Sequence, residues 1–311
     1  MNFLEKIRQP IFADMQLYNN TFAETLSTEN PMLMNISDYV VQKSGDKFRP
    51  TLALLCAKIC GEVNSMSING ALSLELLYIA SVIHDDVVDE NIERHGAPSL
   101  NTRWTNKIAI LSGDYILSKS LSCGIQTDNL AILKSIASIG MQLSDGELLK
   151  LMTATISKES VANYFQLVRK KTAYLFGTCA EVGALSVDAP TAQLHHLKCF
   201  GEYLGISFQI KQDILNLADD LQDGKLTLPL IYALQQSASP QVAEIIKWVE
   251  EQNFSTENAD KMHTFILNNG GIQSAEEQIQ AYKQKAIDEL NDFADSEVKQ
   301  SLILCAEYAA E

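Results

Sequence analysis

Three aspartates stand at the end of the most apolar stretch of the chain. Residues 71–90 read ALSLELLYIASVIHDDVVDE, which is apolar around nearly the whole helical circumference until Asp85, Asp86 and Asp89. Residues three and four apart share one face of a helix, so these like charges destabilise one another unless a cation binds them. Magnesium takes carboxylate and phosphate oxygens and is the typical partner. The cluster therefore predicts a magnesium site for a diphosphate-bearing substrate, rather than a solvated acidic helix end.

His84 and Arg94 flank this cluster. His84 directly precedes the aspartates, and we expect it to pack against its neighbours rather than to bind a metal. Arg94 lies a little more than one helical turn beyond Asp89, where a guanidinium can meet a phosphate through two parallel hydrogen bonds. An exposed loop arginine is an equally good interpretation of this spacing alone.

The composition is that of a folded globular protein. The chain has 311 residues, of which 46% are hydrophobic and 20% charged, and its net charge is −15. This charge argues against binding to nucleic acid or to an anionic membrane, since both need clustered lysine and arginine. An anionic ligand would therefore need metal ions as mediators. We find no secretory signal and no apolar run of roughly 18 residues, and we expect a cytoplasmic protein. The six cysteines include no CxxC pair, which predicts neither disulfides nor a zinc site.

The elements that must position these residues are predicted to be helices throughout. Apolar residues recur at three- and four-residue spacing almost everywhere, without alternating β-branched runs between turn signals. No linker divides the chain, so we predict one all-α domain over residues 1–311. A helix is expected to begin near Thr51, residues 62–69 to form a connection, and a helix to follow over about 70–90. Further helices are predicted at 105–122, 127–152, 159–186, 190–222, 226–236, 240–252, 257–268 and 272–293.

Seven motifs in order, from about residue 44 to 231, carry a resemblance to a known family. The stretch DDVVD at 85–89, followed by Arg94 and Gly96, resembles the first motif of the trans-isoprenyl diphosphate synthase (polyprenyl synthetase) family. The other six matching segments are SGDKFRP at 44–50, LSGDYIL at 111–117, SDGELL at 144–149, KTAYLF at 171–176, SFQIKQDILN at 207–216 and GKLTLPLI at 224–231. Seven matches in the family's order argue strongly against chance.

The resemblance implies an isoprenoid-synthase-type helical bundle around a central cavity, usually a dimer. In this family Mg²⁺ ionises an allylic prenyl diphosphate, and isopentenyl diphosphate attacks the resulting carbocation. Carried onto this chain, the resemblance implies metal ligands, substrate-binding residues, catalytic residues and a product tunnel. The metal ligands are Asp85, Asp86, Asp89 and Asp213; Lys171 and Thr172 are catalytic; Arg49, Lys47, Arg94, Lys171, Gln209 and Lys225 bind substrate; and Leu77, Ala80 and Ser81 line the tunnel. The small Ala80 and Ser81 leave room for a longer product.

The pocket for isopentenyl diphosphate departs from the family pattern. Three positions that are cationic in the family read Asp46, Tyr78 and His95 here. Only Arg49 remains, helped by the neighbouring Lys47. An aspartate beside a diphosphate replaces attraction by repulsion, which is worth about 1 kcal/mol or more even near the surface.

The second metal motif is altered as well. Where the family has DDxxD, the chain has Gln212-Asp213-Ile214-Leu215-Asn216, so two carboxylates have become amides that bring no charge to a metal. At helical spacing, Gln212, Asn216 and Asp220 form a polar stripe. This stripe loosely resembles the metal-binding triad of class I terpene synthases.

Three interpretations follow. The first is a prenyltransferase that makes an all-trans prenyl diphosphate. The second is a terpene synthase-like enzyme that ionises a single prenyl diphosphate, which the polar stripe and the altered pocket favour. The third is a noncatalytic subunit that forms a heterodimer with an active homologue, in place of the homodimer that the family implies. The altered second motif favours this third interpretation.

Overall fold

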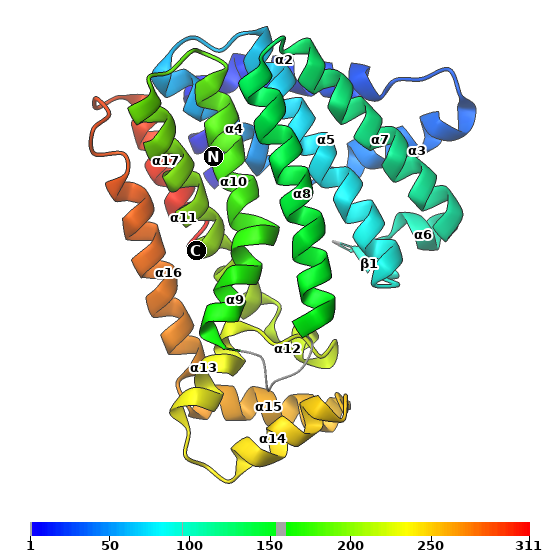
Figure 1. The fold of residues 1–311 in the computed structure, drawn as a ribbon, viewed down its shortest axis with the longest axis vertical. Coiled ribbons are helices and arrows are strands. Elements are labelled where there is room, and N and C mark those ends of the chain that lie inside the picture. Colours follow the sequence, from blue (N-terminus) through cyan, green and yellow to red (C-terminus); the bar gives the residue numbers. More distant parts are fainter. Residues whose placement is uncertain (1, 95, 154–159) are drawn as a thin grey trace. The chain divides into compact units, whose positions relative to one another are not determined.

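The computed structural model describes residues 2–94, 96–153 and 160–311, and helices account for almost all of its regular structure (Figure 1). The predicted all-α class is confirmed. Within the described ranges, the only paired strands are β1 and β2, which match Glu93 with Pro98 and Arg94 with Ala97. The elements are α1 Phe3–Ile7, η1 Gln9–Ile11, α2 Phe12–Leu26, α3 Pro31–Lys43, α4 Phe48–Cys60, α5 Ser65–Val88, β1 Glu93–Arg94, β2 Ala97–Pro98, α6 Leu100–Arg103, α7 Asn106–Gln126, α8 Leu130–Thr153, α9 Val161–Val168, η3 Arg169–Ala173, α10 Tyr174–Leu185, α11 Thr191–Leu215, α12 Leu217–Gln222, α13 Leu228–Gln236, α14 Gln241–Glu250, α15 Thr256–Asn268, α16 Gly271–Asp288 and α17 Glu297–Tyr308.

The helix boundaries differ from the predicted ones where local capping decides them. Helix α5 begins at Ser65, inside the segment for which the sequence predicts a connection. The side chain of Asn64 accepts hydrogen bonds from the backbone N–H groups of Met66 and Ser67, which satisfies donors that the first turn leaves unpaired. The predicted helix at 190–222 is divided at Asn216 into α11 and α12. The sequence patterns also miss α1, α2, α3 and α17.

Helix α5 is the apolar centre of the fold. By length and composition alone this 24-residue helix could cross a membrane, contrary to the expectation that no apolar run is long enough. However, 67% of its most apolar 18-residue window is buried inside the protein, which is the burial of a core helix. In Figure 1, α5 runs beside α7, and the hydroxyls of Ser73 and Ser120 each donate to the other residue's backbone carbonyl (2.8 and 2.7 Å).

The chain groups into two compact units, each assembled from three separate segments. The first unit consists of Met1–Leu143, Thr178–Lys198 and Phe293–Leu302. The second unit consists of Ser144–Gly177, Cys199–Asp292 and Ile303–Glu311. A single domain over the whole chain stays a prediction.

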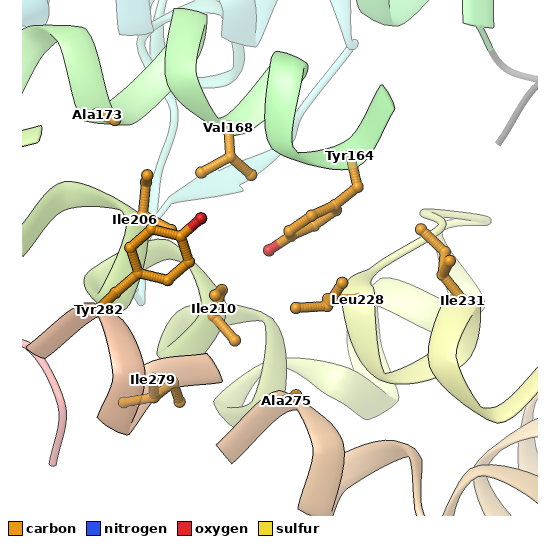
Figure 2. Packing of buried hydrophobic residues seen from close by; sticks show 10 residues of the cluster. All are labelled: Tyr164, Val168, Ala173, Ile206, Ile210, Leu228, Ile231, Ala275, Ile279 and Tyr282. Carbon is orange, nitrogen blue, oxygen red and sulfur yellow. The ribbon is translucent and has the colours of Figure 1, made fainter. Parts of the chain in front are cut away.

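One hydrophobic core of the second unit lies where α9, α11, α13 and α16 meet (Figure 2). Its buried residues are Tyr164, Val168, Ala173, Ile206, Ile210, Leu228, Ile231, Ala275, Ile279 and Tyr282. Helix α16 begins directly against α13, because a Cβ on Gly271 would lie 2.2 Å from the carbonyl oxygen of Pro229. This packing fixes α9 and α11, the helices that carry Tyr164 and Asp213.

Candidate active site

The three aspartates at the end of α5 differ in exposure. Asp86 is buried, Asp85 is half-buried and Asp89 is exposed. Oδ1 of Asp86 accepts hydrogen bonds from Nε of Arg94 (2.8 Å) and from Nδ2 of Asn91 (3.1 Å), and Nη2 of Arg94 lies 2.6 Å from the same oxygen. Asp86, one of the three aspartates, therefore holds Arg94, the predicted phosphate-binding arginine, beside the acidic motif.

His84 packs against α7. Its Nε2 lies 3.4 Å from Oδ1 of Asp114 and 3.2 Å from the carbonyl oxygen of Ile110. This approach requires Gly113, because a Cβ there would lie 2.3 Å from Nε2 of His84. The geometry agrees with the predicted packing role of His84.

The carboxylates at the end of α5 suit a magnesium ion that binds together with a diphosphate substrate. Across the ranges that the structure describes, no three His, Cys, Asp or Glu side chains converge as a ready-made metal site. Magnesium bound with phosphates commonly takes only one or two carboxylates and completes its shell with water and phosphate oxygens. The carboxylates of Asp85 and Asp89 fit that requirement. Magnesium binding by the first motif stays a prediction.

Arg49, at the amino end of α4, is held by two residues of α5. Its Nε and Nη2 donate to the two carboxylate oxygens of Glu75 (2.9 and 3.1 Å), and its guanidinium lies 3.5 Å from the centroid of the Tyr78 ring. The side chain of Glu75 is fully buried and that of Arg49 is 17% exposed. Tyr78, which replaces a cationic position of the family, therefore supports Arg49 through its ring face.

Lys47 and Asp46 form the turn before α4. The backbone of Lys47 is left-handed (φ 55°), and its Nζ donates to Oδ1 of Asn19 (3.0 Å). Burial lowers the pKa of Lys47. Oδ1 of Asp46 accepts the backbone N–H of Phe48 (3.0 Å), so this aspartate supports the start of α4.

Arg8 is a neighbouring cation that the sequence patterns do not single out. Its Nη2 donates to the carbonyl oxygen of Asp46, and its Nε donates to the hydroxyl of Thr51 (2.9 Å). It places a third cation at the amino end of α4, besides Lys47 and Arg49. Arg8 lies 43 residues before Thr51 and in no motif, so spacing gives no signal for it.

Lys171 and Thr172, in the second unit, lie in the π-helical turn η3 between α9 and α10. Such turns within α-helices occur frequently at functional sites. The sequence predicts one unbroken helix at 159–186, and the π turn divides it. Lys171 forms an ion pair with Glu147, and the hydroxyl of Thr172 donates to Oε1 of Gln209 (2.8 Å). Both predicted catalytic residues are thus anchored within this unit.

Asp213 is a buried carboxylate on α11. Its Oδ2 accepts the phenol hydroxyl of Tyr164 (2.6 Å), its Oδ1 accepts Nε2 of Gln209 (2.9 Å), and the backbone N–H of Leu228 donates to it as well. Burial raises the pKa of Asp213 to about 6, although these donors act in the opposite direction. Spacing alone predicts neither Tyr164 nor Leu228 as a neighbour of this carboxylate.

The polar stripe of the second motif does not offer three equivalent ligands. Gln212 is half-buried, Asn216 is exposed and Asp220 is buried. Nζ of Lys225 lies 2.9 Å from Oδ1 of Asp220 and 2.9 Å from Oδ2 of Asp223. The predicted substrate-binding Lys225 is therefore paired with two carboxylates in this structure.

The residues predicted to line the product tunnel all lie on α5. Leu77 and Ala80 are buried, and the half-buried Ser81 donates its hydroxyl to the carbonyl oxygen of Tyr78 (2.9 Å). Their role in product length stays a prediction. His95, the third altered position of the second-substrate pocket, lies outside the described residues.

Comparisons with known proteins extend the resemblance along almost the whole chain. Residues 30–266 match the polyprenyl synthetase family. Octaprenyl diphosphate synthase of Haemophilus influenzae is 32% identical, over 97% of this chain and 94% of that protein. Heptaprenyl diphosphate synthase component 2 of Bacillus subtilis is 26% identical, over 95% of this chain and 87% of its own. The crystal structure of geranylgeranyl pyrophosphate synthase from Bacteroides thetaiotaomicron, 35% identical, matches with a TM-score of 0.87 over 100% of this chain and 99% of that one.

Proposed function

Because the chain belongs to the polyprenyl synthetase family and is a prenyltransferase, we propose that it extends an allylic prenyl diphosphate with isopentenyl diphosphate and releases diphosphate. The observation that carries this proposal is the acidic end of α5, where Asp86 holds Arg94 beside Asp85 and Asp89. Carboxylate oxygens suit a divalent cation, and a guanidinium suits a phosphate. The two parts of a diphosphate site therefore occur together.

The proposed reaction breaks the allylic C–O bond and forms a C–C bond to the alkene carbon of isopentenyl diphosphate, with loss of a proton. Asp85 and Asp89 would hold Mg²⁺, which when bound compensates the charge of the departing diphosphate. Arg94 would bind phosphate oxygens directly. As the family resemblance implies, Lys171 and Thr172 are proposed as catalytic residues, and Lys171, Gln209 and Lys225 as residues that bind substrate.

The cations at the amino end of α4 are proposed to bind isopentenyl diphosphate. Arg49 is oriented by Glu75 and Tyr78, and Lys47 and Arg8 add positive charge at the same turn. Together these three cations offset part of the positive charge that is lost where Asp46 replaces the family's cation. This supports condensation over the terpene synthase-like alternative.

A triple substitution tests this assignment. We expect Asp46→Lys, Tyr78→His and His95→Arg together to lower KM for isopentenyl diphosphate by about thirtyfold. The added positive charge favours binding by roughly 3 kcal/mol, and loss of the Tyr78 ring beneath Arg49 costs about 1 kcal/mol. KM for the allylic substrate should stay the same. Asp38→Lys, at an exposed site, is the control and reproduces the two-charge change made at Asp46. An unchanged KM would place the limit at the second motif instead.

The direct test of the proposed function is incubation of the pure protein and Mg²⁺ with allylic diphosphates, with and without isopentenyl diphosphate. Diphosphate release and chain length are both scored. Elongation supports the proposal. Release without elongation, giving a hydrocarbon or an alcohol, would support the terpene synthase-like alternative. Inactivity that is cured only by adding a homologous synthase from the same source would support the noncatalytic subunit.

We also propose a cytoplasmic homodimer that forms through α7. Four large apolar side chains on one face of this helix are exposed by 44–66%: Ile110, Leu111, Leu121 and Ile125. An apolar stripe of this kind suits burial against a second copy. The relative named as a synthase component 2 supports keeping a heteromer as the alternative.

Charges on this face should separate the copies. Leu111→Glu with Ile125→Glu is expected to convert a dimer into a monomer in light scattering at micromolar concentration, because each carboxylate would lose its hydration at the interface. Leu130→Glu, at a leucine that is 66% exposed on α8, is the matched control and should leave the mass unchanged. A dimer that persists in the double variant would place the interface elsewhere.

A further inference from the structure

Asp213 is the one position of the altered second motif that is still a carboxylate. Hydrogen-bond donors from three elements surround it. Tyr164 comes from α9, Gln209 lies one turn earlier on α11, and Leu228 begins α13. A carboxylate offers about four lone-pair positions. These three hydrogen bonds use most of them, so about one position is left for a metal ion.

The two side-chain donors are fixed by their own surroundings. Tyr164 is 5% exposed within the cluster of buried residues in Figure 2. Its ring also packs edge-on against Phe165, with a centroid distance of 5.4 Å. Gln209 is held at its carbonyl oxygen by Thr172. Neither donor can leave Asp213 without opening packed or hydrogen-bonded structure.

The charges around this motif also disfavour a dication. Gln212 and Asn216 carry neutral amides, and the nearby Asp220 already pairs with the ammonium of Lys225 (2.9 Å). A divalent cation at Asp213 would thus meet one carboxylate that three donors already share, whereas the end of α5 offers the carboxylates of both Asp85 and Asp89. Amide oxygens can bind magnesium, but without charge they hold it less strongly.

We propose that the second motif of this chain holds no metal ion and that metal binding is confined to the aspartates at the end of α5. Tyr164 and Gln209 donate hydrogen bonds to Asp213, and Lys225 forms an ion pair with Asp220, so both carboxylates are already paired with donors. Asp213 then acts as an anchor that joins α9, α11 and α13, in place of the metal role that the resemblance implies. The inference deepens the proposed prenyl transfer and rests on it only for the identity of the substrate.

Counting bound Mn²⁺ tests this directly. Electron paramagnetic resonance gives the number of ions that the full-length protein binds in the presence of inorganic pyrophosphate. We expect Asp213→Asn to keep the wild-type number and Asp85→Asn with Asp89→Asn to lose bound ions. Gln212→Asp with Asn216→Asp should gain one ion, since it restores two carboxylates. One ion fewer in Asp213→Asn, or no gain in the restored variant, would overturn the proposal.

The anchor role has a separate readout in stability. Tyr164→Phe is expected to lower the melting temperature by several degrees, because it leaves a buried carboxylate oxygen without its donor. Tyr232→Phe is the matched control, at a half-buried tyrosine of the same unit, and should shift it by much less. Equal shifts in the two variants would contradict the anchor.

The number of bound Mn²⁺ ions and the elongation assay test separate proposals, and either proposal can be refuted without the other. No elongation with the expected Mn²⁺ counts would refute the proposed reaction and leave the metal assignment intact. Normal elongation with an ion lost in Asp213→Asn would refute the metal assignment alone.

Discussion

Replacing Asp85 and Asp89 together by asparagine is expected to lower kcat/KM for the allylic diphosphate by about 10³-fold or more. The change removes two charges that would hold Mg²⁺ against the departing diphosphate, and electrostatic stabilisation of this kind is commonly worth 10²- to 10³-fold for a single group. The measurement is diphosphate release at saturating Mg²⁺. Asp86 is left unchanged because it also holds Arg94, so its loss would mix two effects.

Asp128→Asn supplies the control for this experiment. Asp128 is exposed and has a left-handed backbone (φ 49°), which asparagine also tolerates. It should release diphosphate at the wild-type rate. If the double variant stays within about threefold of wild type, the end of α5 is not the ionisation site, and the terpene synthase-like and prenyltransferase interpretations both lose their support.

Glu75→Gln is expected to lower the free energy of unfolding by about 3 kcal/mol. Removing one partner of a buried ion pair leaves the other charge without compensation, which typically costs about 3–5 kcal/mol. Arg49, only 17% exposed, would keep the Tyr78 ring and one amide oxygen as acceptor, but it would lose the compensating negative charge and meet an amide NH2 in place of the second oxygen. Urea unfolding measures the difference. KM for isopentenyl diphosphate should rise as well, because Arg49 is no longer oriented.

Glu62→Gln is the matched control for this prediction. Glu62 pairs with Lys58 on the surface, where its side chain is 88% exposed. Exposed pairs contribute at most about 1 kcal/mol, so the loss there should be much smaller. Similar losses for the two variants would mean that the Arg49–Glu75 pair contributes little to stability.

Sequence periodicity predicted the central helix and its acidic end because both are local features. Helix α5 and its three aspartates lie within 24 consecutive residues and the cap that follows, so spacing alone relates them. The start of α5 was mispredicted because one residue, Asn64, decides it through two hydrogen bonds. Helix α3 was missed although Asn30 and Pro31 give a usual start signal, an asparagine cap followed by proline in the first turn.

Contacts between distant segments could not be predicted in this way. Arg49 and Glu75 are 26 residues apart, and Tyr164 and Asp213 are 49 apart. No helical or strand period relates such pairs, and only the packing of α4 on α5 or of α9 on α11 brings them together. The family resemblance singled out Lys171, Thr172 and Asp213, whose roles stay predictions, but it gave no information about which side chains surround them.

The π turn η3 amounts to one surplus residue in an otherwise regular helix. Each residue turns an α-helix by about 100°, so deleting one residue from Arg169–Ala173 would rotate everything before it relative to everything after it. Tyr164 would then swing away from Asp213 while its own sequence stayed intact. Insertion or deletion of one residue in this turn would therefore change the side-chain neighbours of Asp213 in a way that a substitution does not. When relatives are aligned through this segment, the placement of a single gap decides whether Tyr164 is matched with its true counterpart.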